Sequence, residues 1–349
     1  MKKTLISLSI AAITASVVAT HSANAAEFSP AVNGGDDTNE IYTADRSALF
    51  LGGRAEFRGD FNGKESGEKI SGSMEDNSRI RLNIGGTTQI SDSLYGFGFY
   101  EAEQATSDNS GDSNNELQQR YAYVGLKGSF GALSFGRQNT ANVQIADMSD
   151  IATFTGSQKS FIDYADEQQS HNIAYTGQFD NLSIHASAIL GSQKNTNGYG
   201  ISAIYSLPYN INLGLGYTAG EHKNKSSDPD QLSAGLSYDY HNFYAGFTYT
   251  NGRRNKDEDF EGYEFAAKYK FENNLSVIGA YQYQKYKKTD FSDFYELTGA
   301  YDFNSHIQGY LAYKFNRLDT GEQLLFDFAQ RGLDKKAEDT VRIGLKYTF

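Results

Sequence analysis

Apolar and polar residues alternate along much of this chain with a period of two. Over positions 49–61 small or apolar side chains share one face and charged ones share the other, as in Leu49, Leu51, Ala55 and Phe57 against Arg54, Glu56, Arg58 and Asp60. Because successive side chains of a strand point to opposite faces, this pattern predicts a β-strand with one apolar and one polar face. Counting such runs predicts about sixteen strands.

The connections between these runs alternate in length as well. Short turns such as Ser91-Asp92 and His241-Asn242 alternate with longer polar stretches such as 62–75 and 319–338. A soluble sandwich or propeller would fill its apolar faces with Val, Ile and Leu, whereas these faces are rich in Tyr, Phe, Gly and Ala. An even number of antiparallel strands with alternating connections is the layout of an outer-membrane barrel. We therefore predict an all-β fold, a transmembrane antiparallel β-barrel of about sixteen strands.

The first twenty-five residues have the pattern of a secretory signal. Lys2 and Lys3 give a basic start, residues 5–19 are mostly apolar, and Ala23-Asn24-Ala25 is a small-x-small cleavage site. The predicted organisation is a signal peptide over 1–25 and one barrel domain over 26–349. The formal net charge is −12, and loss of Lys2 and Lys3 makes it −14. Such an acidic balance argues against a nucleic-acid partner.

The candidates for catalytic or metal chemistry are weak. The chain has no cysteine, which excludes thiol catalysis and thiolate metal sites. Its 6 histidines lack metal-ligand spacing, and no local catalytic signature stands near a Ser or Asp. The sequence therefore predicts no enzyme activity, no cofactor and no metal site.

One stretch carries a recognisable motif. Arg120-Tyr-Ala-Tyr-Val-Gly-Leu126 is followed by Phe130-Gly131 and by Phe135-Gly136-Arg137, after which about thirty residues have no strand pattern. This series resembles the general porins of Gram-negative outer membranes. The resemblance implies that the segment after Arg137 folds back into the barrel as the third loop and narrows the pore. In place of the Pro-Glu-Phe-Gly-Gly type of tip that is common there, this chain has 151–156, without Pro or Glu.

The resemblance also implies a charged constriction. Arg54, Arg81 and Arg120 match the basic cluster of the barrel wall, and Asp147 and Asp150 are the candidates for the acidic side on the loop. Opposed charges across a narrow gap create a transverse field that orients dipolar solutes. The alternative is that the arginines are ordinary lumen residues, each paired with an acidic neighbour, for which the sequence offers Glu56, Asp60 and Glu101.

The end of the chain alternates strictly and finishes on an aromatic residue. By resemblance, Phe349 and Tyr347 form the signal that the outer-membrane assembly machinery recognises. The outer faces of the first strands would form the contact of a homotrimer. The residues compatible with that contact are Gly53, Ala55, Gly96, Gly98, Tyr121 and Tyr123.

The sequence thus predicts a porin in the outer membrane of a Gram-negative bacterium that lets small hydrophilic solutes and ions diffuse passively. Its expected partners are outer-membrane lipid and lipopolysaccharide, further copies of itself, the assembly machinery and the solutes. One alternative is a substrate-selective porin of the same fold, for which Tyr95, Phe97 and Phe99 would supply part of an aromatic sugar path. The other is a surface adhesin or structural barrel that acts through its loops.

Overall fold

The computed structural model describes residues 31–36, 38–44, 46–62, 74–106, 116–221, 228–318 and 338–349. The predicted signal peptide lies outside these residues, as do parts of four long connections. Among the described residues, no helix combines the length and the apolar character that crossing a membrane requires.

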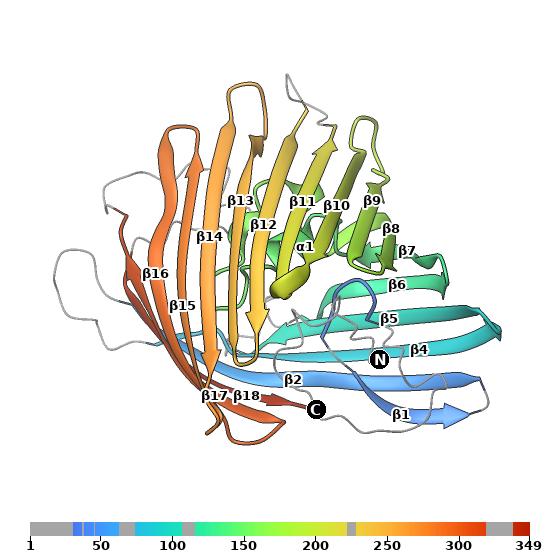
Figure 1. Cartoon of the computed structure of the whole chain (residues 1–349), viewed down its shortest axis with the longest axis horizontal. Coiled ribbons are helices and arrows are strands. Elements are labelled where there is room, and N and C mark those ends of the chain that lie inside the picture. Colours follow the sequence, from blue (N-terminus) through green and yellow to red (C-terminus); the bar gives the residue numbers. More distant parts are fainter. Residues whose placement is uncertain are drawn as a thin grey trace.

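Sixteen long strands form the wall of the molecule (Figure 1). They are β2 (Ser47–Asn62), β4 (Arg79–Ser91), β5 (Leu94–Ala105), β6 (Gln118–Gly128), β7 (Gly131–Gln138), β8 (Gln169–Phe179), β9 (Leu182–Ile189), β10 (Gly198–Leu207), β11 (Ile211–Gly220), β12 (Asp230–Tyr240), β13 (Phe243–Arg253), β14 (Asp259–Lys270), β15 (Leu275–Tyr286), β16 (Thr289–Asp302), β17 (Ile307–Asn316) and β18 (Thr340–Thr348). Two short strands, β1 (Asn39–Ala44) and β3 (Glu75–Asp76), pair with β2.

The sheet closes on itself between its last and first long strands. Each long strand pairs antiparallel with the next in sequence, and β18 pairs with β2 from Thr340↔Asn62 to Thr348↔Arg54. The other edge of β2 pairs with β4. Closure leaves no long strand with an unpaired edge, as a hydrocarbon environment requires. The predicted sixteen-stranded antiparallel barrel is confirmed.

The two faces of the wall are inverted relative to a soluble protein. One face exposes large apolar side chains, among them Leu82, Ile84, Leu215, Leu311 and Leu345. The alternate positions hold buried polar side chains, among them Asn83, Glu101, Gln231, Glu264 and Thr298. A lipid-facing surface and a polar lumen explain this arrangement. We call the polar side the inner face.

Short connections lie at one end of the barrel, and the connections at the other end are longer except for the two-residue turn between β15 and β16. The turn between β10 and β11 is the 3-10 turn η5 (Pro208–Asn210), and the turns after β4, β8, β12, β14 and β16 are of similar size. We call this the short-turn end. In outer-membrane barrels short turns face the periplasm.

Candidate pore constriction

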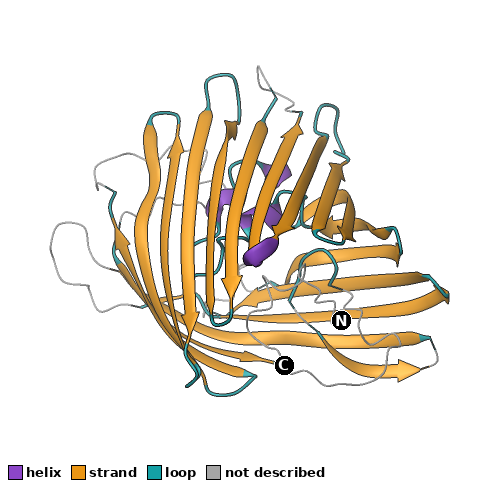
Figure 2. Cartoon of the chain, viewed as in Figure 1, coloured by secondary structure: helices purple, strands orange, loops and turns teal. Residues whose placement is uncertain are grey.

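The connection between β7 and β8, residues 139–168, packs against the inner face. It contains α1 (Val143–Ala146) and two 3-10 turns, η3 (Ser157–Lys159) and η4 (Asp163–Ala165). These elements contact strands β10 to β14. Figure 2 shows the helical turns, in purple, within the curve of the strands. We call residues 139–168 the inner loop.

Glycines on the inner face make room for α1. Ile145 and Met148 of the inner loop are fully buried at 0% exposure. A Cβ atom would lie 2.8 Å from the Met148 sulfur if added at Gly214 and 2.4 Å from it if added at Gly235. At Gly246 a Cβ would come within 1.6 Å of the Met148 carbonyl oxygen. Strand glycines commonly mark close approach of another backbone, and here that backbone is the inner loop.

Glu264 of β14 holds the inner loop through two donors. The Gly156 amide donates to Glu264 Oε2 at 2.8 Å, and the Ser149 hydroxyl donates to Oε1 at 2.7 Å. Gly156 has a φ of +98°, a left-handed conformation that favours glycine. The bend at Gly156 therefore aims a backbone N–H at a carboxylate of the wall.

The tip of the inner loop has a second carboxylate anchor. The amides of Thr153 and Phe154 donate to the carboxylate of Glu296, on β16, at 2.8 and 2.9 Å. The guanidinium of Arg342 lies 3.9 Å from the centre of the Phe154 ring and forms two 2.7 Å hydrogen bonds with Asp60. A cation over an aromatic face and charge-assisted hydrogen bonds together fix the tip against β16, β18 and β2.

The three predicted arginines come together on the opposite part of the wall. Arg54 on β2 is the cross-strand partner of Arg81 on β4, and Arg120 lies on β6. A β-bulge aims Arg120 inward, because Glu101↔Tyr121 is followed by Ala102↔Gln119 and leaves Arg120 as the extra residue. We call these three residues the arginine wall.

The same bulge overturns one prediction. Strict alternation places Tyr121 and Tyr123 outside if Arg120 is inside. Instead all three face inward, and the two tyrosines are only 3% and 5% exposed. They cannot contribute to an outer-face trimer contact, because the extra residue shifts the phase of the strand.

Two acidic residues of β5 pair with the arginine wall. Arg120 Nε donates to Glu101 Oε1 at 2.8 Å, and Glu101 is fully buried. The Glu103 carboxylate pairs with Arg81 Nε and lies 3.8 Å from Arg120 Nη1. Of the acidic partners that the sequence offered for the three arginines, Glu101 does pair with Arg120. Glu56 pairs instead with Arg58 and Arg79, and Asp60 pairs with Arg342.

An N-terminal segment, residues 31–36, brings a further carboxylate to the arginine wall. Asp36 lies 3.3 Å from Arg81 Nη1 and 3.5 Å from Arg54 Nε. Burial opposes the ionisation of Asp36, but the guanidinium groups of Arg54, Arg81 and Arg120 outweigh it and lower the pKa of this carboxyl. Asp36 belongs to no periodic pattern in the sequence and was therefore not predicted as a site residue.

Residues 31–36 pack against a cluster of aromatic side chains on the inner face. Phe97, Phe99, Tyr121 and Tyr123 are buried together, with Ala31 and Val32 packed on them. Gly34 and Gly35 have φ values of +96° and +103°. A Cβ added at Gly35 would lie 2.3 Å from the Phe99 ring. Phe97 and Phe99 face inward as the sugar-path alternative requires, but residues 31–36 cover them.

The predicted acidic residues of the inner loop, Asp147 and Asp150, gather around Lys159, which was not predicted as a site residue. Lys159 Nζ lies 3.5 Å from Asp147, 2.8 Å from Asp150 and 2.7 Å from Glu167. Glu167 also lies 3.9 Å from Arg120 Nη2. One side of the acidic cluster is therefore linked to the arginine wall.

The surroundings separate the pKa values of these acids. Burial raises the pKa of Asp147 to about 7, with Glu167 and Asp150 adding to the effect and Lys159 opposing it. Burial also opposes the ionisation of Glu167, but the Lys159 ammonium is stronger and lowers the pKa of Glu167 to about 2. Near neutral pH, Asp147 is consequently the residue of this pair that changes its charge.

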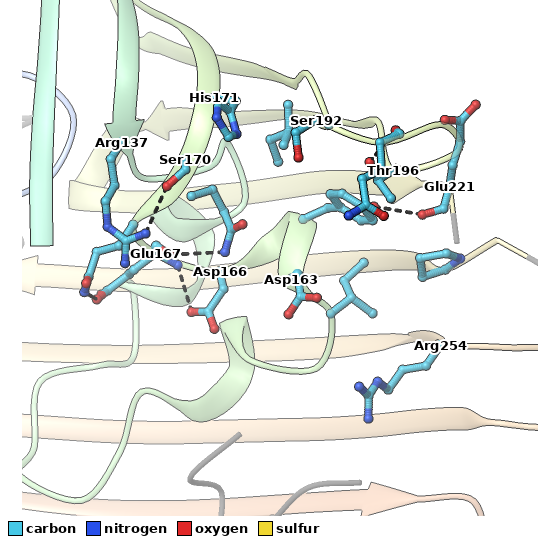
Figure 3. A pocket seen from close by; sticks show the side chains of 18 residues that line it. Arg137, Asp163, Asp166, Glu167, Ser170, His171, Ser192, Thr196, Glu221 and Arg254 are labelled. Carbon is cyan, nitrogen blue, oxygen red and sulfur yellow. Dashed lines mark hydrogen bonds between the residues drawn. The ribbon is translucent and has the colours of Figure 1, made fainter. Parts of the chain in front are cut away.

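A cavity of about 730 Å³ adjoins this cluster (Figure 3). It is lined by the end of the inner loop, by the starts or ends of β8 and β9, and by residues of both signs of charge, including Arg137, Asp163, Asp166, Glu167 and Glu221. Arg137 Nη1 donates to the Ser170 hydroxyl at 3.1 Å. Glu167 lines the cavity and also lies 3.9 Å from Arg120, so this residue connects the cavity lining with the arginine wall.

The last residue lies at the seam of the barrel. The Phe349 amide donates to the Gly53 carbonyl at 3.0 Å, and the Gly53 amide donates to the Phe349 carbonyl at 3.1 Å. Tyr347 is exposed on the outer face, with its ring centre 5.7 Å from that of Phe349. The predicted assembly signal is thus also the segment that closes the sheet.

The described residues contain no group of three or more His, Asp or Glu side chains arranged to hold a metal ion. The arrangement places an arginine cluster of β2, β4 and β6 and an acidic cluster of the inner loop on the polar inner face of the barrel, where Glu167 lies 3.9 Å from Arg120. Such a site can orient and filter solutes.

Comparisons with known proteins match this chain to porins over most of its length. A family model described as Gram-negative porin matches residues 11–321. Outer membrane protein U of Vibrio parahaemolyticus is 32% identical over 370 residues, which cover 100% of both chains. Outer membrane porin C of Enterobacter cloacae is 27% identical over 91% of this chain and 96% of its own.

Solved structures show the same architecture. Salmonella typhi OmpF, solved in complex with daunomycin, matches with a TM-score of 0.78 at 20% identity, covering 89% of this chain and all 100% of that one. OmpT of Vibrio cholerae, solved in a trimer form, matches with a TM-score of 0.66 at 15% identity, covering 87% of this chain and 100% of its own. At these identities the likeness concerns the fold.

Proposed function

The chain belongs to the family of Gram-negative porins and is an outer-membrane porin. We propose that its water-filled channel filters small hydrophilic solutes where the inner loop and the arginine wall narrow the lumen. Porins are channels rather than enzymes. Passage through this protein is passive diffusion, and we further propose that it involves no catalytic step and no cofactor.

The juxtaposition of the arginine wall with the inner loop carries this proposal. Arg120 lies 3.9 Å from Glu167 of the inner loop, whose acidic residues also include Asp147 and Asp150. Charges fixed on opposite sides of a narrow aqueous passage act strongly on a solute, since low-dielectric walls focus their field. Solutes with a dipole can align with the field, and apolar solutes lose hydration without compensation.

The selectivity that follows is a mild preference for cations. Asp36, Glu101 and Glu103 offset the three charges of the arginine wall. On the inner loop, one lysine stands among three carboxylates. The sum over these groups is negative, and more so when Asp147 is ionised, so cations gain more than anions from entering.

Single-channel conductance of the refolded protein in a planar bilayer tests this function. Large ohmic openings with a reversal potential on the cation side in a salt gradient would support it. Silence from protein that is folded and heat-modifiable would overturn it, and would favour the alternative of a loop-acting adhesin.

We propose that the working form is a homotrimer. The solved OmpT structure in a trimer form supports this, as do the small outer-facing residues Gly53, Ala55, Gly96 and Gly98 of the first strands. Closure of the conductance in three equal steps at high voltage is the expected signature.

The remaining expectations concern export and surroundings. We propose that residues 1–25 are removed as a signal peptide and that residues 26–349 form the barrel domain. Phe349 and Tyr347 would be read by the assembly machinery before the seam closes, since both then lie in an unpaired strand. Outer-membrane lipid and lipopolysaccharide would cover the exposed apolar face.

A further inference from the structure

The ammonium group of Lys159 contacts three carboxylates of the inner loop at once. Its Nζ atom lies 2.7 Å from Glu167 Oε1, 2.8 Å from Asp150 Oδ2 and 3.5 Å from Asp147 Oδ1. We propose that Lys159 determines specificity as a fixed counter-ion, which keeps divalent cations such as Ca²⁺ from binding among these carboxylates and blocking the channel. The proposal rests on the channel function and names one residue that sets which ions pass.

The carboxylates are more open to solvent than the ammonium group between them. The side chains of Asp147, Asp150 and Glu167 are 35%, 24% and 27% exposed, whereas that of Lys159 is 10% exposed. An ion in the lumen can therefore reach carboxylate oxygens of the inner loop. The position that such an ion would take among all three of them is occupied by the ammonium group.

The spacing of the three oxygens suits a small divalent cation. All three lie within 3.5 Å of the same nitrogen atom, so no two of them are separated by more than twice that distance. Calcium binds carboxylate oxygens at about 2.3–2.6 Å, so the three groups would need to move inward by about 1 Å at most. Removal of the ammonium group would leave them a space that a cation can fill.

The bend of the inner loop keeps the Asp150 carboxylate in this group. A Cβ atom added at Gly156 would lie 2.3 Å from Asp150 Oδ2, so the glycine leaves space for the carboxylate. The Thr155 hydroxyl donates to Asp150 Oδ1 at 3.4 Å. The carboxylate is thus positioned by its own loop as well as by Lys159, and it remains near Asp147 when the lysine is replaced.

The charge of the group explains why the lysine matters for conduction. With all groups ionised, three carboxylates and one ammonium carry a net charge of −2, and loss of the ammonium makes it −3. Carboxylates at this spacing repel one another and attract any available cation. An ion passes only if its binding is weak enough for release. Lys159 therefore permits a cation preference without strong retention of divalent ions.

Calcium inhibition of the potassium chloride current tests the proposal. Lys159→Met keeps the length of the side chain and removes its charge. We expect K159M to gain a saturable inhibition with a half-inhibitory calcium concentration on the order of 1 mM, as in weak protein calcium sites, and about tenfold or more below that of wild type. K159R keeps the charge and should behave like wild type. Adding D147N and D150N to K159M should abolish the inhibition.

Lys256→Met is the matched control, since it removes one exposed lysine from the connection between β13 and β14. Equal half-inhibitory concentrations in wild type and K159M would overturn the proposal. An equal gain of inhibition in K256M would do so too, as would inhibition that survives D147N and D150N. A purely structural role of Lys159 predicts no dependence on calcium.

Two further measurements keep the outcome clear. K159Q, whose amide can still donate to a carboxylate, replaces K159M if that variant does not refold. Equilibrium dialysis of the detergent-folded protein against radiolabelled calcium measures binding without conduction. Folded K159M that binds calcium more tightly than wild type but does not conduct would refute the channel and keep the counter-ion role of Lys159. Equal calcium binding by both proteins would refute that role and leave the channel function standing.

Discussion

Arg81 Nη1 lies 3.3 Å from the carboxylate of Asp36, although the two residues are 45 positions apart in the sequence. The contact brings the N-terminal segment into the passage and adds a negative charge to a wall that the motif alone marks as basic. The charged groups around the arginine wall consequently come from three separate parts of the chain, namely residues 31–36, the first strands and the inner loop.

Replacing Asp36 by Asn should shift the channel toward anions. The change removes the carboxylate nearest to Arg54 and Arg81 while keeping the shape of the side chain. We expect the anion-to-cation permeability ratio to rise about two- to fivefold, the size of one partly solvated charge contact. Reversal potentials in a potassium chloride gradient measure this. Asp180→Asn, in an exposed short turn, is the control that should leave the ratio unchanged.

Replacing Arg81 and Arg120 by Ser should raise cation preference, and it should also cost stability. Loss of Arg120 leaves the carboxylate of Glu101, which is 0% exposed, without its ionic partner. An unsatisfied buried charge costs about 1–3 kcal/mol or more. Reversal potential and the midpoint of heat modifiability should therefore change together. An unchanged reversal potential would remove these arginines from the filter.

Replacing Glu296 by Gln should loosen the tip of the inner loop. The carboxylate accepts from the amides of Thr153 and Phe154, and a neutral amide has only one accepting oxygen and a weaker attraction for N–H groups. We expect faster hydrogen exchange at these two amides and more frequent closures of single channels. Glu261→Gln, on the outer face of β14, should show neither effect. Unchanged exchange at both amides would show that the Arg342 contact suffices.

Ion selectivity should depend on pH around neutrality. Burial raises the pKa of Asp147 to about 7, so this carboxyl is ionised above that pH and protonated below it. Lowering the pH from 8 to 6 removes a negative charge from the passage, and the cation preference should fall. Asp147→Asn should remove most of this dependence. A full pH response in that variant would assign the titration to another group.

Replacing Gly53 by Ala should weaken closure of the barrel. A Cβ at this position would lie 2.4 Å from the Arg81 carbonyl oxygen and 2.8 Å from the Phe349 ring. The Arg81 carbonyl cannot move without disturbing the pairing of β2 with β4, and the Phe349 ring would have to shift as well, so a cost of about 1–3 kcal/mol and a lower unfolding temperature are expected. Gly279→Ala is the matched control, because its Cβ would have nothing within 4 Å. Equal unfolding temperatures for the two variants would contradict this account of Gly53.

The sequence by itself determined the barrel. Alternation with a period of two is a local property, because each strand must present one face to lipid and the other to water, and Leu82 against Asn83 already displays it. The lengths of the connections between strands are a local property as well. The strand number and the antiparallel order therefore followed from the pattern, and the motif around Arg120 located the arginine wall and the inner loop.

Only the tertiary structure decided what surrounds those residues. One extra residue at Arg120 turned Tyr121 and Tyr123 inward, and a bulge leaves no mark in the alternation. Asp36 and Lys159 lie outside the strands, so no periodicity constrains them, and their contacts form across distances that only chain folding spans. Local pattern thus specifies the wall of this porin, whereas the charge of its passage arises from long-range contacts between segments that have no pattern.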